Sequence, residues 1–260
     1  MNRRQPVLFI GHGNPMNALS DNSFTKSLKK LSETIEKPKA VLVISAHWQT
    51  RGTSITLSDD PRQIYDFYGF PRELYNVVYQ PKGKEELSNY IIETLKKEGT
   101  VVTGVDYWGL DHGSWAILTH IYPEGEIPVL QLSLDSGLDE DSHYELGRKL
   151  SFLRDMGVLV IGSGNIVHNL KEMGTATLSE PHSWAVEFDR YIADSISSGI
   201  HKDLIDYKKA GECAKLSLPT DEHYLPLLYV VAMQTSGEKT EFLYDEIHHS
   251  SLSMRCLKIG

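Results

Sequence analysis

Two apolar patterns alternate along this chain: short continuous runs, and longer segments in which apolar residues recur every three or four positions. The continuous runs, rich in β-branched residues, predict strands at residues 7–10, 40–48, 53–57, 101–102, 127–134, 158–161, 241–244 and 252–259. The helical spacing predicts helices at 23–35, 84–98, 140–156 and 183–198, a short polar element at 202–212, and a last helix at 219–229.

This alternation of strands and helices predicts an α/β fold. Continuous apolar strands are typical of parallel sheets that are covered on both faces. We therefore expect a single domain over residues 1–260, with a mostly parallel central sheet flanked by helices on both faces.

Residues 59–79 show little periodicity and many aromatic side chains. Long ordered loops of this kind often bind ligands, although the rings can equally serve to anchor the loop to the body of the protein. The aromatic residues are Tyr65, Phe67, Tyr68, Phe70, Tyr75 and Tyr79.

The composition narrows the class of protein. Hydrophobic residues make up 40% of the 260 residues and charged residues 23%, as in ordinary globular proteins. The formal charge of −9 opposes binding to nucleic acid or to anionic membranes. No apolar run is long enough to span a membrane, and the amino-terminal segment lacks a signal-peptide core, so a cytoplasmic location is expected. Cys213 and Cys256 are too isolated to suggest a disulfide or a thiolate metal site.

Five histidines lie in sequence contexts that are unusual for surface residues. His12, His47 and His168 follow buried-type strands, His112 is predicted in a Gly-rich loop, and His223 falls in the first turn of the last helix. Any one of them alone is better explained as a turn or packing residue. The carboxyl ends of neighbouring parallel strands meet at one sheet edge, however, and neutral imidazole is the commonest side-chain metal ligand. We therefore expect a metal site at this edge.

Other chemistries have less support. The segment after residue 161 lacks the glycine spacing of a dinucleotide-binding turn, and no phosphate-binding loop ending in Gly-Lys-Ser/Thr occurs. The Gly-x-Ser-x-Gly elbow of serine hydrolases is also absent from the sequence. The remaining histidines have no comparable context and are expected at the surface or in packing: His120, His143, His182, His201, His248 and His249. Pocket lining is the alternative for His182 and for the His248-His249 pair.

Five separated motifs, together with a terminal Ser251-Leu252-Ser253-Met254, resemble the class III extradiol ring-cleavage dioxygenases, in particular the DOPA 4,5-dioxygenase-like branch. The resemblance runs nearly from end to end of the chain. The motifs are Gly11-His12-Gly13-Asn14-Pro15-Met16, Ser45-Ala46-His47-Trp48, Asp111-His112-Gly113-Ser114-Trp115, Ser163-Gly164-Asn165-Ile166-Val167-His168-Asn169 and Glu222-His223-Tyr224-Leu225-Pro226-Leu227.

The resemblance implies one mononuclear non-haem metal ion at the sheet edge. His12 and His47 would be ligands, with His223 as the third and the adjacent Glu222 as its alternative. His168 would either ligate the metal or act as the base that removes a catechol proton. Fe(II) is the expected ion because oxygen activation needs a redox metal, while the histidines would also suit Zn(II).

The same resemblance implies an enzyme that opens the ring of a small, DOPA-like catechol with O2 by 4,5-cleavage. His112 would contact a substrate hydroxyl or the oxygen and donate a proton. Two other functions stay open at this point: a zinc-dependent hydrolase on the same scaffold, with His112 or Glu222 as the base, and a non-catalytic metal-binding protein. The native catechol, the cleavage position, the metal and the oligomeric state are not determined by the sequence.

Overall fold

A central eight-stranded sheet, in the order β4-β3-β5-β2-β6-β1-β10-β7, forms the frame of the protein, whose computed structural model describes residues 4–260. A two-stranded ribbon, β8-β9, lies beside it. The strands are β1 (Val7–Gly11), β2 (Ala40–Thr50), β3 (Thr53–Thr56), β4 (Val102–Val105), β5 (Val129–Asp135), β6 (Val158–Gly164), β7 (Thr240–Tyr244), β8 (Ile247–His248), β9 (Leu252–Ser253) and β10 (Cys256–Ile259).

The centre of the sheet is parallel. Strand β6 pairs in parallel with β1 on one side and with β2 on the other, and β2 pairs in parallel with β5. Antiparallel pairs join β10 to β1 and β7, and a single pairing joins β3 to β5. The predicted α/β fold with a mostly parallel sheet is therefore confirmed.

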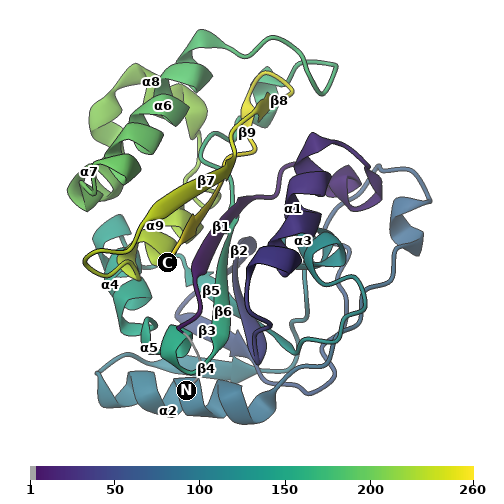
Figure 1. The fold of residues 1–260 in the computed structure, drawn as a ribbon, viewed down its shortest axis with the longest axis vertical. Helices are drawn as coiled ribbons and strands as arrows, with labels where there is room; N and C mark the ends of the chain where they lie inside the picture. The colour runs from purple at the N-terminus through teal and green to yellow at the C-terminus, as the bar shows by residue number, and fades with distance from the viewer. Residues whose placement is uncertain (1–3) are drawn as a thin grey trace.

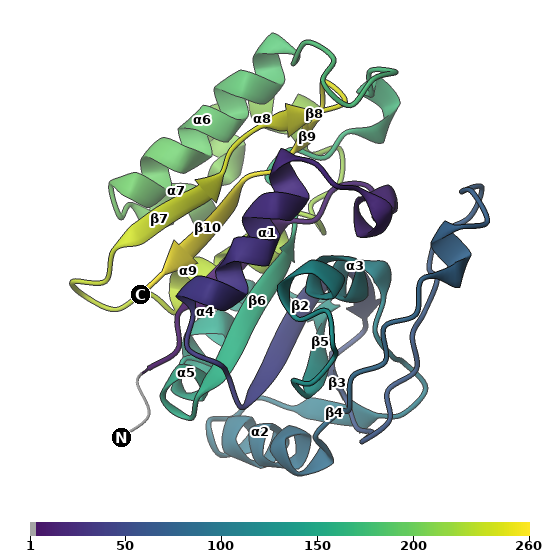
Figure 2. The same ribbon diagram turned by 45° about the vertical axis from the view of Figure 1, so that its right-hand side comes forward.

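Helices cover both faces of this sheet (Figure 1). Helices α1 and α3 pack together on the face that is nearer the viewer in Figure 2, and α4 and α9 pack together on the other face. No helix of the described residues is long and apolar enough to cross a membrane. The helices are α1 (Ser23–Thr34), α2 (Glu85–Lys97), α3 (His112–Ile121), α4 (Glu140–Lys149), α5 (Phe152–Asp155), α6 (Ser183–Ser197), α7 (His201–Ile205), α8 (Glu212–Ser217) and α9 (Leu225–Ala232), with short 3-10 turns η1 (Pro15–Leu19), η2 (Leu74–Asn76), η3 (Leu170–Glu172) and η4 (Tyr207–Ala210).

The alternation of side chains along each strand divides the core into two layers. In β1, Val7 and Phe9 belong to the core on the α4 and α9 side, whereas Leu8 and Ile10 belong to the core under α1 and α3. All four side chains are fully buried. This explains why β1 reads as a continuous apolar run, because neither face of the strand meets solvent.

The aromatic segment between β3 and α2 has little regular structure, as predicted, and lies at one side of the molecule in Figure 2. Its rings do anchor it: Tyr65 and Phe67 lie against the Trp115 ring of α3, whose indole N–H also donates a hydrogen bond to Ile64 O at 2.9 Å. The loop is therefore held to the body on the side of α3.

Several predicted boundaries were wrong near the ends of the central strands. Strand β2 continues past His47 to Thr50, with an irregularity in its pairing after Ile44, and β6 includes residues 162–164. Helix α9 begins only at Leu225, so His223 lies in the turn before it, while His112 is the first residue of a helix rather than part of a loop. The closing strand predicted at 252–259 is divided into β9 and β10.

The helix predicted over residues 140–156 is divided into α4 and α5. Arg154 of α5 turns its guanidinium inward, where the side chain is fully buried. It donates to Glu238 Oε2 at 2.8 Å and Oε1 at 2.5 Å, and to the carbonyl oxygens of Gln5 and Met233. One side chain thus ties the amino-terminal segment, α5 and the segment before β7 together.

Substitution of Glu238 tests this buried ion pair. Burial by itself would raise the pKa of the Glu238 carboxyl, but hydrogen bonds from Arg154 and from Thr235 N hold the pKa below its usual value. The ionised carboxylate therefore stabilises the fold above the pKa of an unfolded glutamate, and this contribution is lost as the pH falls through the folded pKa. We expect Glu238→Gln to lower the free energy of unfolding at pH 7 by about 2 kcal/mol, measured by urea denaturation.

The difference between wild type and Glu238→Gln should shrink as the pH falls below about 4. Glu241 provides a matched control, because its ion pair with Lys258 leaves the carboxylate side chain 60% exposed. Glu241→Gln should change the free energy of unfolding by less than about 0.5 kcal/mol. Equal losses for the two variants at pH 7 would contradict the assignment.

Candidate functional site

The register of three neighbouring parallel strands brings the sequence motifs together. Gly11 at the end of β1 lies opposite Gly164 at the end of β6, and Ser45 of β2 lies opposite Ser163. His12 follows β1 directly, and His47 comes two residues after Ser45. The structure therefore confirms the expected convergence of these strand ends at one edge of the sheet.

His223 reaches the same place because β6 ends in a glycine. A Cβ added to Gly164 would lie 2.0 Å from the carbonyl oxygen of His223, so any other residue would displace the turn before α9. The backbone N–H of Asn165 donates to the same carbonyl oxygen at 2.8 Å. Close backbone approach thus fixes the turn against the end of the strand.

A cavity of about 420 Å³ opens at this edge. All five histidines of the motifs line it, and the remaining lining is mostly apolar. Its residues are His12, Gly13, Asn14, Pro15, His47, Asp66, Phe67, Tyr68, Phe70, His112, His168, Leu170, Met173, His223 and Leu252.

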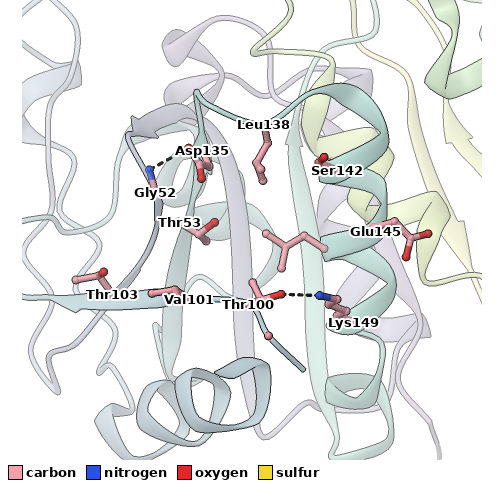
Figure 3. A pocket seen from close by; sticks show the side chains of 12 residues that line it. Gly52, Thr53, Thr100, Val101, Thr103, Asp135, Leu138, Ser142, Glu145 and Lys149 are labelled. Carbon is pink, nitrogen blue, oxygen red and sulfur yellow. Dashed lines mark hydrogen bonds between the residues drawn. The ribbon is translucent and has the colours of Figure 1, made fainter. Parts of the chain in front are cut away.

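A second cavity, of about 480 Å³, lies between α4 and the strands β3 and β4. Figure 3 shows two hydrogen bonds among its lining residues: Gly52 N donates to Asp135 Oδ1 at 2.9 Å, and Lys149 Nζ donates to Thr100 Oγ1 at 2.6 Å. No histidine or cysteine lines it. The chemistry predicted from the sequence belongs to the first cavity.

The hydrogen bonds of His12 and His223 determine which ring nitrogen carries the proton. The Ser163 hydroxyl donates its one hydrogen to Gly113 O at 2.5 Å, so it accepts at 2.9 Å from Nδ1 of His12. The carboxylate of Glu222 can only accept, and it lies 3.0 Å from Nδ1 of His223. In both rings the proton is therefore on Nδ1, and Nε2 is left with a free lone pair.

His12 and His223 form, together with His47, a group whose ligand nitrogens all lie within 4.8 Å of one another. Nε2 of His12 lies 3.0 Å from Nε2 of His47, whose Nδ1 lies 3.4 Å from Asp66 Oδ2. Nε2 of His223 is buried without a hydrogen-bond partner, and its ring centroid lies 5.4 Å from that of His12. Two nitrogens that share one metal ion at about 2.1 Å, with a right angle between the bonds, lie about 3.0 Å apart. The donor set of His12, His47 and His223 thus fits a divalent metal ion.

Burial keeps these rings in the form that binds metals. Burial, and then repulsion by neighbouring histidines, hold the pKa of His12, His47 and His223 well below the usual value of an imidazole. The nearby carboxylate of Asp66 acts to raise the pKa of the His47 ring but does not outweigh the lowering effects. The three rings are therefore neutral near pH 7, with lone pairs available for coordination.

His168 lies in the cavity but in a different orientation. Its ring stacks on that of His223, with centroids 3.5 Å apart and planes 7° apart. The lone pairs of an imidazole lie in the plane of its ring. Because the two ring planes are stacked rather than shared, an ion in the plane of His223 lies outside the plane of His168. Burial, and then the nearby His112, lower the pKa of His168 to about 4.

Asp66, which the sequence motifs did not single out, contacts two of these histidines. Its Oδ1 accepts from the backbone N–H of His112 and its Oδ2 from His112 Nδ1, both at 2.8 Å. Burial alone would raise the pKa of Asp66, but the hydrogen bonds from His112 lower it. Only its place in the aromatic loop, flagged as a binding loop, gave any signal in the sequence.

A fully buried polar network lies behind His47 and His112. The Asp111 carboxylate accepts from Ser45 Oγ at 2.8 Å and from the side-chain amide of Gln131, whose oxygen accepts from Ser114 Oγ at 2.7 Å. Burial, and then the charge of Asp66, raise the pKa of Asp111 to about 6. The network joins β2, β5 and the start of α3 directly beneath the cavity.

The other histidines stay outside this site. His120 and His143 are buried and bonded to Asn17 O and to the Tyr229 hydroxyl. His248 and His249 line a small neighbouring pocket, and His182 stacks on Trp184.

Comparisons with known proteins identify the family of this chain. The family described as the catalytic LigB subunit of aromatic ring-opening dioxygenase matches residues 6–254. A protein of Escherichia coli (strain K12) named 4,5-DOPA dioxygenase extradiol is 42% identical, over 99% of this chain and 95% of its own length. A protein of Beta vulgaris with the same name is 41% identical, over 94% and 91%.

The fold has a solved counterpart as well. The crystal structure of an uncharacterized protein from Escherichia coli K12 superposes with a TM-score of 0.86 at 39% sequence identity, covering 99% of this chain and 100% of that one. Both the sequence match and the structural match extend over the strand ends that carry the histidines. The chain therefore belongs to the LigB family of aromatic ring-opening dioxygenases.

Proposed function

We propose that this protein is a metal-dependent extradiol dioxygenase that opens the ring of a small, DOPA-like catechol with O2. The observation that carries the proposal is the convergence of the ring nitrogens of His12, His47 and His223 in a mostly apolar cavity, where Nε2 of His223 has no hydrogen-bond partner among the described residues. The names of the relatives support DOPA-like 4,5-cleavage.

These three histidines would hold the metal, which we propose to be Fe(II). When bound there, divalent iron would lower the pKa of a coordinated catechol hydroxyl and supply the electrons that activate O2. Glu222 lies against Nδ1 of His223, on the side of the ring away from Nε2. Its role in the proposal is therefore to orient His223 rather than to be a ligand itself.

His168 and His112 would carry the protons. Because His168 stacks flat on His223, the plane of its ring does not contain the point at which Nε2 of His223 is aimed, although His168 lines the same cavity. We assign it as the base that accepts a catechol proton. His112 is bonded to Asp66 through Nδ1, which leaves Nε2 to exchange a proton with an oxygen atom at the ring-opening position.

The apolar wall completes the site. The cavity that contains the histidines is also lined by Phe67 and Phe70 of the aromatic loop and by Leu170 and Met173 from the segment after β6. Apolar side chains of this kind accept the faces of a flat aromatic ring and exclude water from the reacting centre.

Anaerobic loading with Fe(II), followed by DOPA and O2, tests the function. The expected result is consumption of one O2 per DOPA and formation of a coloured ring-opened semialdehyde, measured by an oxygen electrode and by absorbance. Absence of both across a panel of catechols, with iron occupancy confirmed, would overturn the proposal. Ester or amide hydrolysis by the zinc-loaded protein without O2 would favour the hydrolase instead.

Histidine substitutions separate the proposed ligands from the proposed base. His223→Ala should lose stoichiometric metal, because it removes one of three nitrogens, whereas His168→Ala should keep it and lose at least about 100-fold in kcat. Metal content by mass spectrometry and steady-state rates measure the two effects. His182→Ala is the control, because His182 lies outside the cavity and should change neither. Loss of metal in His168→Ala would make His168 a ligand.

The lack of lysine and arginine in the described lining of the cavity predicts how the carboxylate of the substrate side chain affects kcat/KM. Among the described residues, neither lysine nor arginine lines the cavity. A hydrogen bond to a charged group is worth about 1.5–3 kcal/mol, or about 10- to 150-fold in binding. Since the cavity offers no cation to the DOPA carboxylate, dopamine should retain kcat/KM within about 10-fold of the value for DOPA.

Lys171 is adjacent to Leu170 of the cavity wall and provides the matched variant for this prediction. Lys171→Gln should leave the ratio of the DOPA and dopamine rates unchanged. A dopamine rate more than about 100-fold lower, restored toward equality by this substitution, would show that a lysine outside the cavity binds the carboxylate.

A further inference from the structure

We propose that Asp66 is a positioning residue of the site: its carboxylate holds His112 in the tautomer that presents Nε2 to the cavity, and the same carboxylate lies beside the ring of His47. The catalytic consequence rests on the proposed function, because it requires His112 to exchange a proton with the substrate. The positioning itself is a property of the protein without metal or substrate.

The contacts of one carboxylate carry the proposal. Oδ1 of Asp66 accepts from the backbone N–H of His112 and Oδ2 accepts from its Nδ1, both at 2.8 Å. The same Oδ2 lies 3.4 Å from Nδ1 of His47. An ionised carboxylate can only accept hydrogen bonds, so it selects the ring form of His112 with the proton on Nδ1.

Two attachment points fix both the position and the rotation of the ring. His112 is the first residue of α3, and the side chain of the preceding Asp111 makes no hydrogen bond to the start of this helix. Asp66 supplies that capping interaction from a distant loop, where the positive end of the helix favours an anion. The bond to Nδ1 then sets the rotation of the imidazole about its side-chain bonds.

His47 connects this arrangement to the proposed metal ligands. Its ring centroid lies 4.0 Å from that of His112, and its Nε2 faces His12 at 3.0 Å. A carboxylate on the far nitrogen of a metal-binding histidine is the usual device for orienting the ring. Asp66 therefore acts on a proposed ligand and on the proposed proton-transfer residue at once.

The loop around Asp66 is anchored without this carboxylate. Ile64 N donates to Leu110 O and Leu110 N to Arg62 O, each at 2.8 Å, and the Trp115 indole donates to Ile64 O at 2.9 Å. Phe67 also lies against Trp115. Substitution of Asp66 should therefore leave the loop in place and change mainly the histidines that it contacts.

The first experiment uses metal-free protein labelled with ¹⁵N-histidine, and does not depend on activity. Nuclear magnetic resonance of the ring nitrogens, with His112 identified by its loss in His112→Gln, should show a protonated Nδ1 and a bare Nε2 in wild type. In Asp66→Ala the proton should redistribute toward Nε2. An unchanged His112 tautomer in Asp66→Ala would overturn the proposal.

The second experiment measures kinetics of iron-loaded protein at confirmed metal content. Asp66→Ala should lower kcat by about 10- to 100-fold and leave KM within about threefold, since the residue orients groups rather than binds substrate. Asp66→Glu, which keeps the acceptor, should recover part of this loss. A loss in Asp66→Ala that appears in KM alone would contradict a positioning role.

Asp60→Asn is the matched control, because Asp60 is an exposed carboxylate of the same loop that pairs with Lys82. It should change neither the tautomer of His112 nor kcat. If wild type opens no catechol ring, the proposed function fails, while the tautomer measurement still decides the positioning role of Asp66. The two failures are therefore distinguishable.

Discussion

The site depends on the close approach of three largely buried, neutral imidazole rings, those of His12, His47 and His223. Nε2 of His12 and Nε2 of His47 lie 3.0 Å apart, and Nε2 of His223 is buried with no partner. A buried ring nitrogen without a partner, such as Nε2 of His223, costs free energy. The fold must therefore hold the rings rigidly, and the same constraint makes the group suitable for a divalent metal.

The surrounding structure supplies that rigidity through polar contacts on the outer side of each ring. Ser163 fixes His12 and Glu222 fixes His223, each through Nδ1, so that both rings direct Nε2 inward. Glycine at the end of β6 lets the turn that carries His223 lie directly against the strand. The parallel register of β1, β6 and β2 places the carboxyl ends of these three strands at one edge of the sheet.

The aromatic loop contributes both chemistry and shape to this edge. Phe67 and Phe70 give the cavity an apolar wall suited to a flat ring, and Asp66 between β3 and α2 reaches across to His112 and His47. Loop, helix α3 and strand β2 thus meet at a single carboxylate. Family membership indicates the type of reaction, while the contacts of this chain's own residues indicate how protons would be handled there.

The sequence by itself determined the α/β fold and the histidine set, because buried parallel strands have a distinctive apolar pattern and their carboxyl ends must share an edge. It did not determine the exact limits of β2, β6 and α9, nor the break before Arg154, since these depend on contacts between distant segments. Only the tertiary structure separated the orientation of His168 from that of His223, and brought Asp66 to His112 across 46 positions. Ring orientation and loop contacts leave no periodic signal along a chain, so the fold has to be formed before they exist.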